Sequence, residues 1–140
     1  MKRTGHAVWN GDLKTGKGAL TTGSGVLKDT KYGFKTRFED EPGTNPEELI
    51  GAAHAGCYSM ALSMILGEQG LVADEIRTQA DVHLDEVVGG FEITAVDLKV
   101  RARISDASDH DFQKAADAAK TGCPVSKLLK AQISLDAALD

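Results

Sequence analysis

The chain has 140 residues and a mass of 14.8 kDa, about the length of one domain, so we expect a single domain over residues 1–140. Hydrophobic residues account for 41% and charged residues for 26%, a globular composition that needs no disulfide scaffold to build a core. The net charge of −5 and the lack of any basic tract argue against a nucleic-acid partner.

The N-terminal segment does not have the pattern of an export signal. Residues 1–6 turn polar where a signal peptide needs an apolar stretch, so we expect a cytoplasmic protein. The two cysteines are too few for the disulfide framework of a small secreted domain. In a cytoplasmic chain, such cysteines are free, reactive or bound to a metal.

The first third of the chain has the pattern of short strands. Three runs, at residues 6–9, 18–22 and 32–38, are apolar or β-branched with partial alternation. Asn10-Gly11-Asp12 follows the first run and favours a tight turn. These features predict a β-meander.

A long helix is predicted next, ending near Gly67 or Gly70. Asn45 is placed as its N-cap, Pro46 as its first residue and Glu48 at its third position, which is a capping-box arrangement. Acidic side chains in this first turn also complement the positive end of the helix dipole.

The same helix is apolar enough to raise the question of a membrane span. The 18 residues from 49 to 66 contain no charged side chain. Small and polar residues interrupt the run, however, and no Lys or Arg flanks it. We therefore interpret it as the central helix of a soluble core and expect no membrane partner.

The second half alternates strands and helices. Residues 76–84 alternate apolar and polar side chains, Gly89-Gly90 predicts a hairpin, and a long strand follows with a bulge near Ala95. Three further elements are predicted: a helix over residues 109–120, a short helix from Cys123-Pro124 to about Lys130, and a final strand over residues 133–137. The order predicts an α+β fold with largely antiparallel sheets packed on the long central helix.

The two cysteines are the first candidates for chemistry. Cys123 lies at a helix start, which lowers a thiol pKa, so by local argument it is the better thiolate. Cys57 lies inside the long helix and needs a cation brought by the fold. The alternative for both is an inert place in the core, because cysteine is among the most buried residue types.

Other polar residues have weaker patterns. Arg37 is a candidate for the missing cation, although an exposed surface arginine is the ordinary interpretation. His54 and Cys57 are three residues apart and, with Cys123, would give three zinc ligands, but no fourth ligand is evident. No phosphate-binding glycine loop lies between a strand and a helix, so nothing in the pattern predicts a nucleotide cofactor.

Two segments resemble the motifs of one protein family. GTNPEELIGAAHAGC at residues 43–57 is similar to the first cysteine motif of the OsmC/Ohr family, and GCPVS at residues 122–126 is similar to the second. The resemblance extends over essentially the whole chain, including Ala7-Val8-Trp9 and Tyr32-Gly33-Phe34, and is closest to the OsmC branch. The OsmC/Ohr family comprises the osmotically inducible and the organic-hydroperoxide-resistance proteins.

The resemblance implies a thiol-dependent peroxidase that reduces organic hydroperoxides in osmotic and oxidative stress. It implies Cys57 as the attacking thiolate, Cys123 as the resolving thiol that forms a disulfide with it, and Arg37 as the activating cation. Glu47 would hold the arginine, with Glu48 as the neighbour that could be confused with it. An external dithiol of the lipoyl type would be the reductant, and no metal, flavin or haem cofactor is implied.

Helix geometry bears on the assembly. Glu47 and Cys57 are ten residues apart, so a continuous helix separates them by about 15 Å. If both serve one site, Glu47 must come from a second copy, which predicts a two-fold homodimer. The family resemblance implies that the two chains of this dimer are intertwined. Two alternatives to the enzyme stay open: a non-catalytic thiol redox sensor or metal-binding module, and a dimeric stress protein with inert cysteines.

Overall fold

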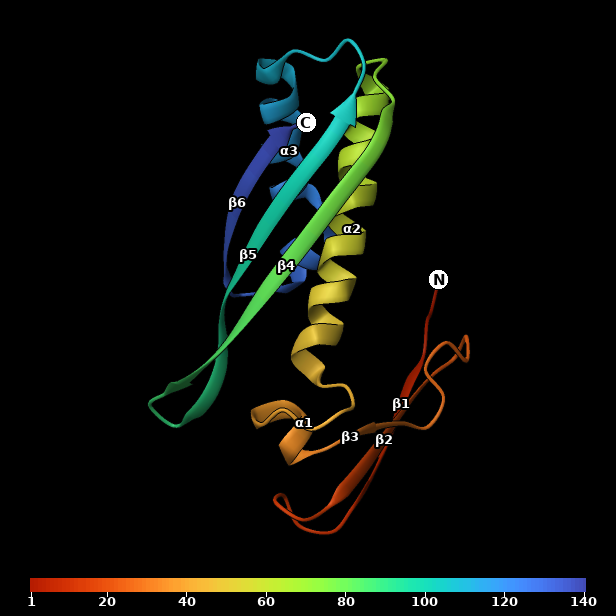
Figure 1. Ribbon diagram of the computed structural model, residues 1–140, viewed down its shortest axis with the longest axis vertical. Helices are drawn as coiled ribbons and strands as arrows, with labels where there is room; N and C mark the ends of the chain where they lie inside the picture. Colours follow the sequence, from red (N-terminus) through yellow and green to blue (C-terminus); the bar gives the residue numbers. More distant parts are fainter. The chain divides into compact units, whose positions relative to one another are not determined.

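The computed structural model describes residues 1–140 as two compact units, Met1–Leu49 and Ile50–Asp140 (Figure 1). The first unit contains strands β1 to β3 and helix α1. Helix α2 begins at the end of the first unit and continues into the second, which holds the remaining strands and helices. The expectation of a single domain over residues 1–140 stays a prediction.

The first unit is built on a three-stranded antiparallel sheet. Its strands are β1 (Gly5–Asn10), β2 (Lys17–Thr22) and β3 (Thr30–Tyr32), in the order β1-β2-β3. The turn after β1 has Gly11 at a φ of 93°, a conformation that favours glycine. The predicted meander is therefore confirmed for the first two strands.

The third predicted strand is wrong over most of its length. The chain is a strand only to Tyr32, and Phe34–Phe38 forms the short helix α1. The Thr36 hydroxyl accepts a hydrogen bond from the Gly33 amide (2.8 Å) and donates one to the Gly33 carbonyl (3.0 Å), which closes a helical turn. Phe34 and Phe38 are four residues apart, and their ring centroids lie 4.9 Å from each other, as expected for neighbours on one helix face.

Helix α2 runs over Pro46–Glu68, as predicted. Asn45 caps it, since its side-chain oxygen accepts a hydrogen bond from the Glu48 amide at 2.8 Å. The second half of the predicted capping box is different: the Glu48 carboxylate accepts from the Thr44 hydroxyl at 2.5 Å. One face of the helix is buried through residues spaced three or four apart: Gly51, His54, Tyr58, Leu62 and Leu66.

The sheet of the second unit combines both strand orientations. β4 (Ala73–Val87) and β5 (Gly90–Ile104) form a long antiparallel hairpin, and β6 (Gln132–Leu139) pairs with β5 in parallel. The predicted bulge is confirmed, because the pairs His83–Ala95 and Leu84–Ile93 leave Thr94 as the extra residue. The fold is α+β with sheets that are largely antiparallel, as predicted.

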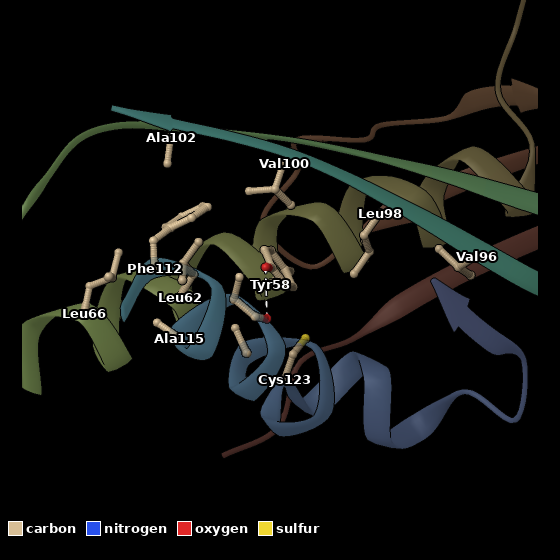
Figure 2. Close-up of a cluster of buried hydrophobic side chains, with 12 residues drawn as sticks. Tyr58, Leu62, Leu66, Val96, Leu98, Val100, Ala102, Phe112, Ala115 and Cys123 are labelled. Atoms are coloured by element: carbon tan, nitrogen blue, oxygen red, sulfur yellow. Dashed lines mark hydrogen bonds between the residues drawn. The ribbon is translucent and has the colours of Figure 1, made fainter. Parts of the chain in front are cut away.

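Helices cover one face of this sheet (Figure 1). They are α2, α3 (Asp109–Gly122) and the short α4 (Pro124–Leu128). Figure 2 shows the core between these helices and the sheet, in which alternate side chains of β5 meet Phe112 of α3 and the buried face of α2. The Tyr58 hydroxyl donates to the carbonyl of Ala116 at 3.1 Å, so the buried phenol has its partner.

The other face of α2 is exposed and apolar. Met60 and Met64 are 76% and 62% exposed. By length and composition α2 could cross a membrane, and 28% of its most apolar window is buried, but the central helix of a soluble protein meets the same criterion. Between the acidic residues at its two ends, the exposed positions of α2 lie on one helix face: Ala52, Ala53, Gly56, Met60, Ser63, Met64 and Gly67.

Candidate active site

The two cysteines come from different elements of the second unit. Cys57 lies near the middle of α2 and is partly exposed, whereas Cys123 occupies the N-cap position of α4 and is fully buried. Cys123 is held by the end of α3 on one side, where its amide donates to the carbonyl of Ala119 at 3.0 Å. Pro124 then provides the fixed φ of a first helical residue.

The fold brings the two thiols into contact. Their side chains hydrogen bond to each other, and both cysteines are reduced. The amide of Val125, in the first turn of α4, hydrogen bonds to both sulfurs. The fold therefore brings together two cysteines that are 66 residues apart in the sequence, and their sulfur atoms meet at the N-terminus of α4.

The surroundings shift the pKa values of the two thiols in opposite directions. Burial raises the pKa of Cys57, and donation of its hydrogen to Cys123 raises it further. Burial also acts to raise the pKa of Cys123, but hydrogen bonds from Cys57, from the Ser126 and Val125 amides and from the Ser126 side chain lower it overall. In the reduced chain Cys123 is therefore the better thiolate, in agreement with its predicted place at a helix start.

A buried histidine and serine border the thiol pair. His54 lies one turn before Cys57 on α2, and its Nε2 atom is 2.8 Å from the Oγ atom of Ser126. Sequence reasoning considered His54 only as a zinc ligand and did not assign a role to Ser126. A signal was present: Ser126 is the third residue of the helix whose N-cap position is Cys123, and side chains there reach back to the N-cap.

Arg37 and Glu47 form an ion pair within the first unit. The Arg37 Nη2 atom lies 2.6 Å from Oε1 of Glu47, and its Nε atom lies 3.0 and 3.2 Å from the two carboxylate oxygens. The Glu47 side chain is 12% exposed, so the pair is partly shielded from water. Glu48 instead bonds to Thr44, which distinguishes the two neighbouring acids. The role of the pair in catalysis stays a prediction.

The ion pair also refines the prediction of a shared site. Arg37 and Glu47 belong to the same chain, so a second copy that supplies Glu47 supplies Arg37 with it.

No group of three or more His, Cys, Asp or Glu side chains in residues 1–140 is placed to hold a metal ion. His54 uses Nε2 for Ser126, which removes that nitrogen from the suggested zinc set.

Two contacting thiols at a helix N-terminus, on an α+β frame with a long central helix, define a small thiol protein. Residues 38–138 match the family described as OsmC-like protein, and the chain belongs to this family. It is 54% identical to peroxiredoxin OsmC of Escherichia coli over 136 residues, which covers 97% of this chain and 95% of the relative. It is 34% identical to the organic hydroperoxide resistance protein OhrB of Bacillus subtilis, covering 84% and 85% of the two chains.

Solved structures agree on the fold. The crystal structure of OhrB from Bacillus subtilis covers 98% of both chains with a TM-score of 0.67 and 28% identity. An OsmC-like protein of unknown function from Vibrio cholerae covers 99% of both chains with a TM-score of 0.79 at 14% identity, a likeness of fold alone. The predicted family and fold are confirmed.

Proposed function

We propose that the chain is a thiol-dependent peroxidase that reduces organic hydroperoxides to alcohols through Cys57 and Cys123. The observation that carries the proposal is the hydrogen-bonded pair of a partly exposed and a buried thiol. The names of relatives, a peroxiredoxin and an organic hydroperoxide resistance protein, support the same reaction and substrate class. The corresponding physiological role is protection in oxidative and osmotic stress.

Exposure supports Cys57 as the attacking sulfur. A hydroperoxide must reach the nucleophile, and Cys123 has no exposed surface whereas Cys57 does. The pKa order works against this assignment, because burial raises the pKa of Cys57. A cation beside Cys57 would resolve the conflict by favouring its thiolate.

We assign that cation to Arg37 of the partner subunit, held by its glutamate. Helix α2 is continuous over Pro46–Glu68, so about 15 Å of helix rise separate Glu47 from Cys57 of the same chain. An antiparallel α2 from a second copy brings the two positions together. A planar guanidinium oriented by a carboxylate can then stabilise the thiolate and the charge that develops on the peroxide oxygens.

The exposed apolar surfaces support the homodimer. None of the buried hydrophobic residues lies in residues 1–49, although Val8, Trp9 and Leu13 are apolar and exposed there. A three-stranded sheet with so little core gains stability from further cover. The exposed stripe of α2 that contains Met60 and Met64 is a second uncovered apolar surface, and a two-fold copy of the chain covers both.

The reaction proceeds in three steps. The Cys57 thiolate attacks the distal peroxide oxygen, so the O–O bond breaks, an S–O bond forms, and the alkoxide takes a proton to become the alcohol. The Cys123 thiolate then attacks the Cys57 sulfenic acid; the S–O bond breaks, a disulfide forms, and hydroxide leaves as water after protonation. An external dithiol, of the lipoyl type, reduces the disulfide by exchange and becomes a disulfide itself.

None of the three steps requires a metal, flavin or haem, and we propose that the protein acts in the cytoplasm, where thiols are kept reduced. The alternative is a non-catalytic redox sensor with the same thiols. The two differ in rate, because a sensor without an activating cation reacts with peroxide as slowly as a free thiol.

The test is stopped-flow oxidation of the pre-reduced protein with cumene hydroperoxide and with hydrogen peroxide, followed by a count of free thiols. The enzyme is expected to lose both thiols, and to lose them faster with the organic peroxide. Loss at the rate of a free thiol would refute the peroxidase and favour the sensor.

A further inference from the structure

A chain of polar contacts leads from His54 through Ser126 to the sulfur of Cys123. His54 has no exposed surface, and its Nε2 atom is 2.8 Å from Oγ of Ser126, while its Nδ1 atom is buried without a hydrogen-bond partner. The Ser126 side chain and amide both hydrogen bond to the sulfur of Cys123. The contacts therefore run from α2 through the first turn of α4 to the buried thiol.

The hydrogen positions in this chain follow from counting donors. A serine hydroxyl has one hydrogen to donate. If that hydrogen goes to the Cys123 sulfur, Oγ of Ser126 must accept from an Nε2–H of His54. Nδ1 is then an unprotonated lone pair, which is less costly to bury unpaired than an N–H donor.

The protonation of the ring is consistent with this order. Burial lowers the pKa of His54 and keeps the imidazole neutral, with a single N–H to donate. The order of donation is therefore Nε2–H of His54 to Oγ of Ser126, and Oγ–H of Ser126 to Sγ of Cys123.

The Ser126 hydroxyl differs from that of an ordinary helical serine. Ser59 on α2 donates to the carbonyl of Ala55 in its own helix at 2.9 Å, the usual local bond of such a residue, and its oxygen also lies 2.8 Å from the hydroxyl of Thr78 on β4. The Ser126 hydroxyl instead joins the Cys123 side chain, at the N-cap of its own helix, to the His54 side chain of α2. Its position 72 residues from His54 means that the fold, and not the local helix, makes this contact.

We propose that His54 and Ser126 are positioning residues for the resolving step, which hold the Cys123 sulfur as a thiolate directed at Cys57. The proposal rests on the proposed function. In the step concerned, the Cys123 thiolate displaces hydroxide from the Cys57 sulfenic acid, so the sulfur–oxygen bond breaks as the disulfide forms. The two donors stabilise the thiolate that forms when the Cys123 thiol releases its proton to solvent, and the proton that converts hydroxide to water also comes from solvent.

The experiment is single-turnover oxidation of the pre-reduced, full-length protein with cumene hydroperoxide, resolving sulfenic acid formation from disulfide formation. Ser126→Ala is expected to slow the second phase about tenfold or more, because it removes a hydrogen bond to a charged sulfur, and to leave the first phase unchanged. Ser126→Thr keeps the hydroxyl and is expected to retain the second phase. Ser59→Ala is the matched control, since its hydroxyl does not contact either thiol.

His54 is tested with a pair of variants of similar volume. His54→Leu removes the donor to Ser126 and is expected to slow disulfide formation several-fold, whereas His54→Gln places an amide N–H near the position of Nε2 and recovers part of the rate. A second readout does not depend on turnover. In a Cys57→Ser background, the ultraviolet absorbance of the Cys123 thiolate is titrated, and its midpoint is expected to rise in Ser126→Ala.

Two results would overturn the proposal: disulfide formation at the unaltered rate in Ser126→Ala, or equal slowing of both phases, which indicates general damage to the fold. A failure of the proposed function has a different signature. There the unaltered protein shows no fast first phase with hydroperoxide, while the absorbance titration still reports whether Ser126 stabilises the thiolate of Cys123.

Discussion

Glu47 holds the guanidinium of Arg37 by two of its nitrogen atoms, with Nη2 at 2.6 Å and Nε at 3.0 Å from the same carboxylate oxygen. This is the geometry in which an arginine is fixed in orientation and leaves its other donors free. The carboxylate lies at the first turn of α2, where its charge also complements the helix dipole. The ion pair therefore holds the positively charged guanidinium in a fixed orientation, and both of its members come from one chain.

The first prediction concerns this pair. Arg37→Met is expected to lower kcat/KM for an organic hydroperoxide by about 100-fold or more, the usual effect of removing a preorganised donor from a developing anion. Glu47→Gln is expected to give a smaller loss, because the guanidinium remains but is less well oriented. Steady-state peroxidase assays measure both. Glu48→Gln is the control, since Glu48 bonds to Thr44; a loss in this variant equal to that of Glu47→Gln would contradict the assignment.

The second prediction separates the two cysteines. Cys57→Ser is expected to abolish reaction with hydroperoxide, whereas Cys123→Ser should consume one equivalent and then stall as a sulfenic acid, because no resolving thiol remains. Mass spectrometry after trapping the sulfenic acid with dimedone measures where the oxidation lies. The pKa order in the reduced chain predicts the reverse if no cation reaches Cys57, so a sulfenic acid on Cys123 would reassign the roles.

Much of this arrangement can be predicted from the sequence where the determinants are local. Asn45 and Pro46 mark the start of α2, and the glycine pair at 89 and 90 marks the hairpin. The error at residues 34–38 is also local: Thr36 and the spacing of Phe34 and Phe38 favour a helical turn over alternation.

The contacts between distant residues could not be predicted in the same way. No local pattern indicates that β6 runs parallel to β5, since this depends on where α3 and α4 return the chain. The bond between His54 and Ser126 likewise joins positions 72 residues apart. Family motifs indicated that both segments matter, but a motif does not specify which side chains within it meet.

The third prediction concerns the homodimer. Met60→Glu places a charge on the exposed apolar face of α2 and is expected to convert dimer to monomer, with loss of peroxidase activity as the arginine of the second copy is removed. Light scattering after size-exclusion chromatography measures the mass. Val88→Glu, at the fully exposed tip of the β4–β5 hairpin, is the control and should stay dimeric. A monomeric and fully active protein would refute the shared site.

The fourth prediction concerns acid stability. Burial lowers the pKa of His54 in the folded chain below its ordinary value of 6.5, so between the two pKa values the unfolded state binds a proton that the folded state does not. The free energy of unfolding is therefore expected to fall as the pH drops below 6.5, by up to about 1.4 kcal/mol per pH unit from this one group. Above that pH the imidazole is neutral in both states, and its contribution is constant.

Urea denaturation at pH 7 and pH 5, followed by circular dichroism, measures this dependence. His54→Gln cannot titrate, so its free energy of unfolding should fall less between the two pH values than that of the unaltered protein. His6, which is exposed, provides the control: His6→Gln should keep the full pH dependence. If the unaltered protein and His54→Gln lose the same free energy, the buried imidazole is not the group that resists protonation, and the neutral donor assigned to the Ser126 contact would lose its support.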